Sequence, residues 1–153
     1  NGRLVQVDSP RKLYENPTNR FVADFLGMIS FVAGRVTKAA STALVIDSTP
    51  PITAAIDQQR GLASQPEKGA QVTLAIRPEK ISLSAVATGA VNEIPVIVED
   101  LAYLGVASNY RVKTADGQMF KLQQQQSRRA SKPLEWGDAG FIQFDPADVI
   151  ILP

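Results

Sequence analysis

The stretch SNYRVKTADGQMFKLQQ, residues 108–124, decides the fold class. Apolar and polar residues alternate on both sides of Asp116-Gly117, which is the pattern of a half-buried β-strand. An Asp-Gly pair between two such runs favours a tight turn, because that turn uses positive φ angles that Asp tolerates and Gly adopts freely. The stretch therefore predicts antiparallel strands at residues 108–114 and 119–124, joined as a hairpin.

The same period of two extends outward in both directions and ends at turn residues about every ten positions. It predicts five more strands, at residues 29–38, 42–46, 71–76, 94–104 and 139–144. Residues 48–68 contain prolines, a glycine and glutamines, so we interpret them as a long connection with at most one irregular strand. No internal repeat of fixed period is visible. The pattern predicts a mainly β fold, and favours a small barrel of the OB type over a flat sandwich.

Two short helices are predicted before this β region. Ser9 can cap the first, and Pro10 suits a first helical position because its missing amide has no partner there. The second begins after Pro17 and has apolar residues four positions apart on one face. Gly27 fits the left-handed position that ends such a helix.

Composition excludes several classes of site. The chain has 153 residues, of which 44% are hydrophobic, no Cys, no His and a net charge of +1. Catalytic triads, zinc sites and a neutral-pH histidine shuttle are therefore absent from this sequence. Glu99 and Asp100 are adjacent, so we expect them on opposite faces of a strand, a poor acid/base pair. No apolar run approaches the roughly 20 residues of a membrane span, and no signal peptide is evident.

Three groups of residues resemble one protein family, the ATP-binding subunits of ABC importers. The first 27 residues resemble the end of the ATPase domain in that family, through GRLVQV at 2–7, SP at 9–10, LYE at 13–15, FVA at 21–23 and FLG at 25–27. The run IRPEKI, residues 76–81, resembles the signature of the TOBE domain that follows. A third group of residues resembles the polyamine (spermidine/putrescine) subgroup of this family, namely Tyr103, Gly105, Tyr110, Trp136, Gly137 and Asp138.

The resemblance implies a division of the chain and a role. Residues 1–27 would be the tail of the ATPase domain with its connecting helices, and residues 28–153 an OB-like TOBE regulatory domain. The sequence has no phosphate-binding loop and no Leu-Ser-Gly-Gly-Gln signature. The resemblance thus implies a non-catalytic module for regulation and dimerisation, with no catalytic, cofactor-binding or metal-binding residues. ATP and Mg²⁺ would bind elsewhere in the parent subunit. The implied partners are a second copy of that subunit, with which it would form a homodimer, and the membrane permease subunits. The parent subunit would be a peripheral protein at the cytoplasmic face of the inner membrane.

Two of these motifs allow two interpretations. Arg77, Pro78 and Glu79 would form either a charged pair at a domain or subunit contact, or a local ion pair at a strand end. We expect Trp136 to close the core as a buried aromatic, with an exposed contact as the alternative. Residues 145–148, Asp-Pro-Ala-Asp, are interpreted as a structural turn.

Two other functions remain open. An oxyanion-binding or small-ligand TOBE module of a different importer could use Ser82, Ser84 and Thr88 as donors. A single-stranded nucleic-acid-binding OB module needs a basic groove with exposed aromatics. The densest basic stretch, residues 128–132, has no aromatic residue, and the chain is nearly neutral. No nucleic acid partner is therefore expected.

Overall fold

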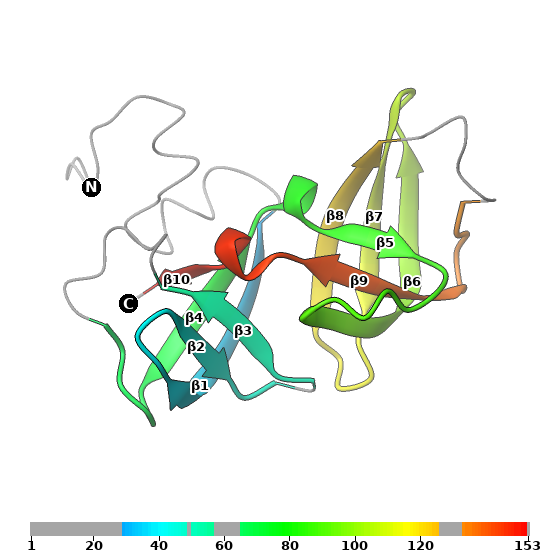
Figure 1. Cartoon of the computed structure of the whole chain (residues 1–153). Coiled ribbons are helices and arrows are strands. Elements are labelled where there is room, and N and C mark those ends of the chain that lie inside the picture. Colours follow the sequence, from blue (N-terminus) through cyan, green and yellow to red (C-terminus); the bar gives the residue numbers. More distant parts are fainter. Residues whose placement is uncertain (1–28, 49, 57–64, 126–132, 153) are drawn as a thin grey trace, which may run out of the picture.

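The computed structural model describes residues 29–48, 50–56, 65–125 and 133–152 of the chain. These residues form β-strands joined by turns and two short 3-10 helices (Figure 1). The prediction of a mainly β fold is confirmed. The two predicted helices, the division at residue 27 and the basic stretch at 128–132 lie outside the described residues.

All seven predicted strands are present. They are β1 (Ser30–Ala39), β2 (Ala43–Ile46), β4 (Gln71–Ile76), β6 (Asn92–Tyr103), β7 (Ala107–Lys113), β8 (Met119–Gln125) and β9 (Ala139–Phe144). Three further strands were not predicted, namely β3 (Ile52–Ala55), β5 (Ser82–Ser84) and β10 (Ile150–Leu152). The connection predicted at residues 48–68 thus contains a regular strand, β3, which pairs along its full length with β2.

The described strands form two curled sheets where the sequence predicted one small barrel. The first sheet has the order β10-β4-β1-β2-β3, and the second has the order β5-β9-β6-β7-β8. Both are antiparallel. Inward-facing side chains of the two sheets, among them Leu74 and Phe120, belong to one continuous core. The two sheets therefore pack as one body.

The two sheets are copies of one motif. Strands at the same place in the two sheet orders correspond to each other: β10 to β5, β4 to β9, β1 to β6, β2 to β7 and β3 to β8. Strands β4 and β9 have the same burial pattern, and β1 and β6 each carry a register shift after Val36 and Val98. Glu67, Gly69 and Pro78 recur at a constant spacing as Glu135, Gly137 and Pro146. The repeat is not visible in the sequence, because burial is preserved at positions whose residue types differ.

Each copy gives its last strand to the other sheet. Strand β4 leads through η1 (Pro78–Lys80) to β5 in the second sheet, and β9 leads through η2 (Pro146–Asp148) to β10 in the first. Proline occupies the first turn of both 3-10 helices, where its missing amide costs nothing. The Asp145 side chain accepts a hydrogen bond from the Ala147 amide at 2.8 Å, so the predicted turn at residues 145–148 is confirmed.

Two buried polar side chains join the copies at equivalent places. Asn92, at the start of β6, pairs with the outer edge of β3: its Oδ1 accepts from the Thr53 amide and its Nδ2 donates to the Thr53 carbonyl, both at 2.8 Å. Ser30, at the start of β1, accepts at Oγ from the Lys121 amide of β8 at 2.8 Å. Asn92 is 1% exposed and Ser30 3% exposed. Each side chain therefore hydrogen-bonds the backbone of an edge strand that belongs to the opposite copy.

The predicted hairpin of residues 108–124 is confirmed, but its turn differs from the one expected. The Gly117 amide donates to the Thr114 carbonyl at 3.1 Å, and Gly117 has a φ of 90°. No described non-glycine residue has positive φ, so Asp116 does not adopt the left-handed conformation. These are the features of a three-residue loop in which only the glycine is left-handed. Asp116 contributes instead by accepting a hydrogen bond from the Thr114 hydroxyl.

Candidate interaction surface

The structure separates the predicted site residues into two groups. Arg77, Pro78 and Glu79 lie at the start of η1, which packs against β8, with Arg77 buried and Glu79 exposed. The other group lies on strands β6 and β7 and on the turn before β9, at one end of the second sheet; it contains Tyr103, Gly105, Tyr110, Trp136, Gly137 and Asp138. The second group forms a continuous structural unit.

The turn at Glu135–Asp138 is held by hydrogen bonds at both ends. The Asp138 amide donates to the Glu135 carbonyl at 3.0 Å, and the Asp138 carboxylate accepts from the Glu135 amide at 2.8 Å. Gly137 has a φ of 86°, which only glycine adopts at no steric cost. Two backbone hydrogen bonds, from Gly137 to the Val98 carbonyl and from Val98 to the Asp138 carbonyl, fasten the turn to β6. The backbone conformation at Trp136 is therefore fixed by its neighbours.

Trp136 does not close the core as expected. Its side chain is 78% exposed, because it occupies a solvent-facing position of this turn. Leu134, two residues earlier, packs against the core in its place. The exposure that the alternative interpretation of Trp136 requires is thus present, whereas the contact stays a prediction.

Two tyrosines connect the Trp136 turn to the neighbouring hairpin. The buried Tyr110 donates from its hydroxyl to the Leu134 carbonyl at 3.1 Å. Tyr103, which is 54% exposed, donates to Oε1 of Glu135 at 3.3 Å. Desolvation first, and then the negative charge of Glu135, raises the pKa of the Tyr103 phenol. Both phenols therefore remain protonated donors at neutral pH.

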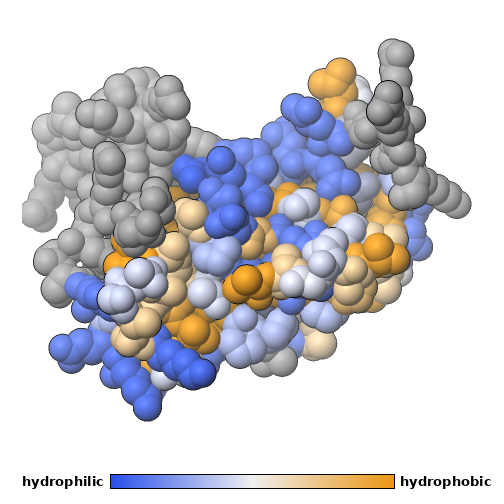
Figure 2. Space-filling view, viewed as in Figure 1, coloured by the Kyte–Doolittle hydropathy of each residue, from blue (hydrophilic) through white to orange (hydrophobic). Residues whose placement is uncertain are grey.

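The tip of the β6–β7 hairpin carries further exposed apolar side chains. Leu104 is 54% exposed and Val106 83% exposed, and between them Gly105 has a φ of 79°. Figure 2 shows hydrophobic side chains at the projecting end of this sheet, where the β6–β7 turn lies in Figure 1. We call Tyr103, Leu104, Val106 and Trp136 together the Trp136 surface.

The first copy of the motif shows that the fold does not require an apolar surface here. Its β1–β2 turn has the same closing hydrogen bond, from Ala40 to Ala43 at 3.0 Å, that Leu104 and Ala107 make in the β6–β7 turn. Trp136 corresponds to Lys68 of the first copy, because the turns at both places make the same hydrogen bonds to Val98 and Val36. The paired residues Val98 and Val112 lie 14 positions apart and Val36 and Ile46 only 10, so the β6–β7 hairpin is four residues longer than the β1–β2 hairpin. Exposed apolar side chains on this extension, and a tryptophan where the first copy has lysine, indicate a contact surface.

Glu99 and Asp100, expected on opposite faces of β6, are both exposed. The register shift between Val98 and Asp100 interrupts the alternation of buried and exposed residues along the strand, so both carboxylates are exposed to solvent.

The donors predicted for an oxyanion are engaged by a carboxylate of the chain itself. Glu93 accepts from the Thr88 amide at 2.6 Å, the Thr88 hydroxyl at 2.7 Å and the Gln143 amide group at 3.0 Å. Gln143 also donates to the hydroxyl of Ser84, whereas Ser82 Oγ faces the Gln143 carbonyl at 3.4 Å. Thr88 and Ser84 thus belong to a cradle around Glu93 and Gln143.

We predict that Glu93 titrates at an unusually low pH. The hydrogen bond from the Thr88 amide, followed by that from the Thr88 hydroxyl, lowers the pKa of Glu93 from 4.5 to about 2. Because the pKa is depressed in the folded state, the stabilisation is complete above pH 4.5 and is lost as the pH falls towards 2. NMR of the side-chain carboxyl carbon should show a midpoint near 2 that E93Q removes. A titration midpoint of Glu93 near 4.5 would show that the hydrogen bonds from Thr88 do not stabilise its carboxylate.

The described residues include no group of three or more His, Cys, Asp or Glu side chains that could hold a metal ion. No helix in the described part of the chain has the length and hydrophobicity that crossing a membrane requires.

Comparisons with known proteins agree with this architecture. The TOBE domain family matches residues 74–152, more than half of the chain. The chain is 32% identical to the spermidine/putrescine import ATP-binding protein PotA of Thermobifida fusca, over 99% of this chain and 38% of that protein. It is 33% identical to the putrescine transport ATP-binding protein PotG of Escherichia coli, over 99% of this chain and 40% of that protein.

The chain thus spans about two fifths of the length of these relatives. Among solved structures it is similar to the cytoplasmic molybdate-binding protein ModG with molybdate bound, at a TM-score of 0.66 and 15% identity, over 80% of this chain and 95% of that one. At this identity the likeness concerns the fold. The family match and the two curled, strand-exchanged sheets together show that the chain belongs to the TOBE domain family.

Proposed function

We propose that this chain is a non-catalytic accessory module of the ATP-binding subunit of a polyamine ABC importer, and that its Trp136 surface joins two copies of that subunit. The relatives that it matches over nearly its full length are named as polyamine import ATP-binding proteins, which supports the class of parent protein. The observation that carries the assembly role is the exposure of Tyr103, Leu104, Val106 and Trp136, the first three on a hairpin four residues longer than that of the first copy and the last where the first copy has Lys68.

The proposed role has a simple physical basis. An ATPase subunit whose nucleotide domains separate after each cycle loses its partner by diffusion unless another contact persists. A second contact within the same chain keeps the partner at a high effective concentration and makes re-association intramolecular. Tryptophan and tyrosine suit such a contact, because they dominate the binding energy of many interfaces. In the parent subunit the module would lie at the cytoplasmic face of the inner membrane, next to the permease, with ATP and Mg²⁺ bound elsewhere.

The observations favour this role over oxyanion binding. Thr88 and Ser84, two of the three predicted donors, take part in the cradle around Glu93 and Gln143, and a carboxylate already stands where an anion would sit. A ligand of the same charge would have to displace it.

Sedimentation equilibrium of the 153-residue chain tests the proposal, together with an assay of ATP hydrolysis. We expect a reversible monomer–dimer equilibrium and no hydrolysis above the rate without protein. Strict monomer behaviour at the highest attainable concentration would refute the assembly role, whereas substantial hydrolysis would refute the accessory role. The two failures are thus distinguishable.

A further inference from the structure

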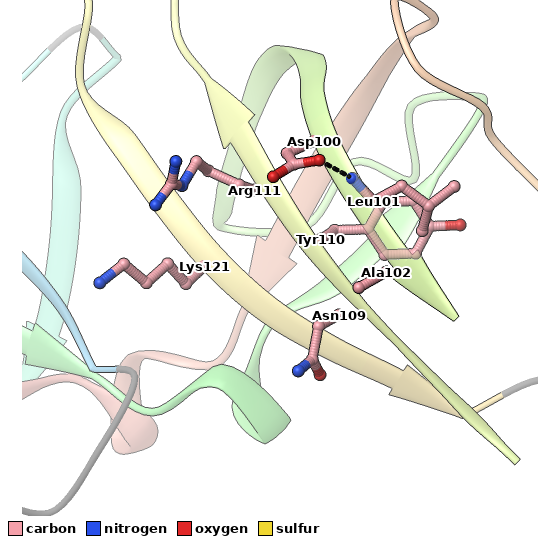
Figure 3. A pocket seen from close by; sticks show the side chains of 7 residues that line it. All are labelled: Asp100, Leu101, Ala102, Asn109, Tyr110, Arg111 and Lys121. Atoms are coloured by element: carbon pink, nitrogen blue, oxygen red, sulfur yellow. Dashed lines mark hydrogen bonds between the residues drawn. The ribbon is translucent and has the colours of Figure 1, made fainter. Parts of the chain in front are cut away.

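A groove on the second sheet shares no residue with the Trp136 surface or with the Glu93 cradle. It has a volume of about 350 Å³ and is formed by strands β6, β7 and β8. Arg111 from β7 and Lys121 from β8 extend to the same side of the sheet, whereas Leu101 and Tyr110, which also line the groove, extend to the other side (Figure 3). Ala102 and Asn109 are register partners two positions from Asp100 and Arg111, so they share the side of the cations. The groove therefore combines two cationic groups with a small apolar residue and an amide.

The two cations lie directly opposite each other on adjacent strands. Arg111 and Lys121 are register partners of the β7–β8 pair, an arrangement in which like charges repel. The described part of the chain shows no ion pair of either side chain. Asp100 is the register partner of Arg111 on the other side, and one of its carboxylate oxygens accepts a hydrogen bond from the Leu101 amide at 2.9 Å. One positive charge of the groove therefore remains uncompensated.

Hydrogen bonds fix the backbone of both cationic residues. The Lys121 amide donates to Ser30 Oγ at 2.8 Å, where the two copies of the motif meet, and Arg111 lies in a central strand paired on both sides. In the first copy Val45 and Thr53 form the equivalent pair of β2 and β3. The fold thus accepts uncharged residues at both places, and the repulsive pair needs another explanation.

We propose that this groove binds a small organic phosphate. Its anionic group would lie between the guanidinium of Arg111 and the ammonium of Lys121, where charge-assisted hydrogen bonds form and the repulsion is relieved. The amide of Asn109, which also lines the groove, supplies a further polar contact, and the body of the ligand covers Ala102. The carboxylate of Asp100 selects against highly charged anions. This site is independent of the assembly role.

Titrations of the 153-residue chain with adenosine monophosphate, inorganic phosphate and adenosine test this proposal by NMR. Adenosine monophosphate should bind at least about tenfold more tightly than adenosine, which lacks the anionic group, and shift the amide signals of Arg111 and Lys121. R111Q and K121Q should each weaken the binding by about tenfold or more. K113Q is the matched control, because Lys113 is an exposed cation of β7 outside the groove. It should bind as the wild type does.

Two results would overturn the proposal. One is an affinity for adenosine monophosphate that is undetectable or that R111Q and K121Q leave unchanged. The other is tighter binding of a short single-stranded oligothymidylate with the same dependence on Arg111 and Lys121, which would make the face a nucleic-acid surface. Thermal unfolding of all three variants, compared with the wild type, confirms that the fold is retained.

Discussion

Replacing Asn92 by alanine is expected to lower the free energy of unfolding by about 2 to 4 kcal/mol. The change removes two hydrogen bonds to Thr53 and leaves its amide and carbonyl without this partner at the edge of β3, in addition to opening space at a fully buried position. For a chain of this length the melting temperature should fall by roughly 6 to 12 °C. Because a domain is stable by only about 5 to 15 kcal/mol, this is a large fraction of the total.

Ser30→Ala is the matched control for Asn92→Ala, since Ser30 occupies the equivalent position of the first copy. It loses one good hydrogen bond, from the Lys121 amide, and should cost about 1 kcal/mol. Urea unfolding measures both variants, and hydrogen exchange should show faster exchange of the Thr53 amide in N92A alone. If N92A stays within about 0.5 kcal/mol of the wild type, the coupling of the two copies through Asn92 is disproved.

Replacing Trp136 by lysine should weaken self-association about 30-fold or more while leaving the fold intact. The substitution introduces the residue type that Lys68 has in the equivalent turn, so the turn itself accepts it. Loss of a tryptophan that anchors an interface typically costs at least about 2 kcal/mol, which corresponds to that factor in the dissociation constant. Since the side chain is 78% exposed, the unfolding free energy should change by less than about 0.5 kcal/mol.

Val86→Thr is the control for removal of an exposed apolar side chain. Val86 is 70% exposed but lies in the loop after β5, outside the Trp136 surface. Sedimentation velocity should show unchanged association for V86T and weakened association for W136K. Equal effects of both substitutions would mean that association is a nonspecific response to hydrophobicity.

Seven strands were predictable because each has a buried face, which the period of two makes visible in the sequence. The missed strands β5 and β10 have three residues each, and β10 is buried at every position, so neither offers an alternation to detect. Their pairing with distant partners depends on the strand exchange through η1 and η2. Such non-local pairing leaves no local pattern. The proline at the start of both 3-10 helices was the signal that could have indicated a repeat.

The candidate surface was only partly predictable. Tyr103, Tyr110 and the Trp136 turn were identified together by resemblance, but the burial of Trp136 was inferred from the general tendency of aromatic residues. Gly137 directly after Trp136 signalled a tight turn, in which the preceding side chain faces solvent. The groove with Arg111 and Lys121 was not anticipated at all. Its two cations become neighbours only through the register of β7 and β8, which sequence alone does not specify.

Trp136 is the only tryptophan of the chain, so its fluorescence reports directly on the proposed contact. At low protein concentration its emission should resemble that of tryptophan in water, because the side chain is 78% exposed. As concentration rises and copies associate, the emission should shift to the blue and iodide quenching should decrease, in parallel with the dimer fraction from sedimentation. Association without any change in Trp136 emission would contradict the account, because the copies would then meet through another surface.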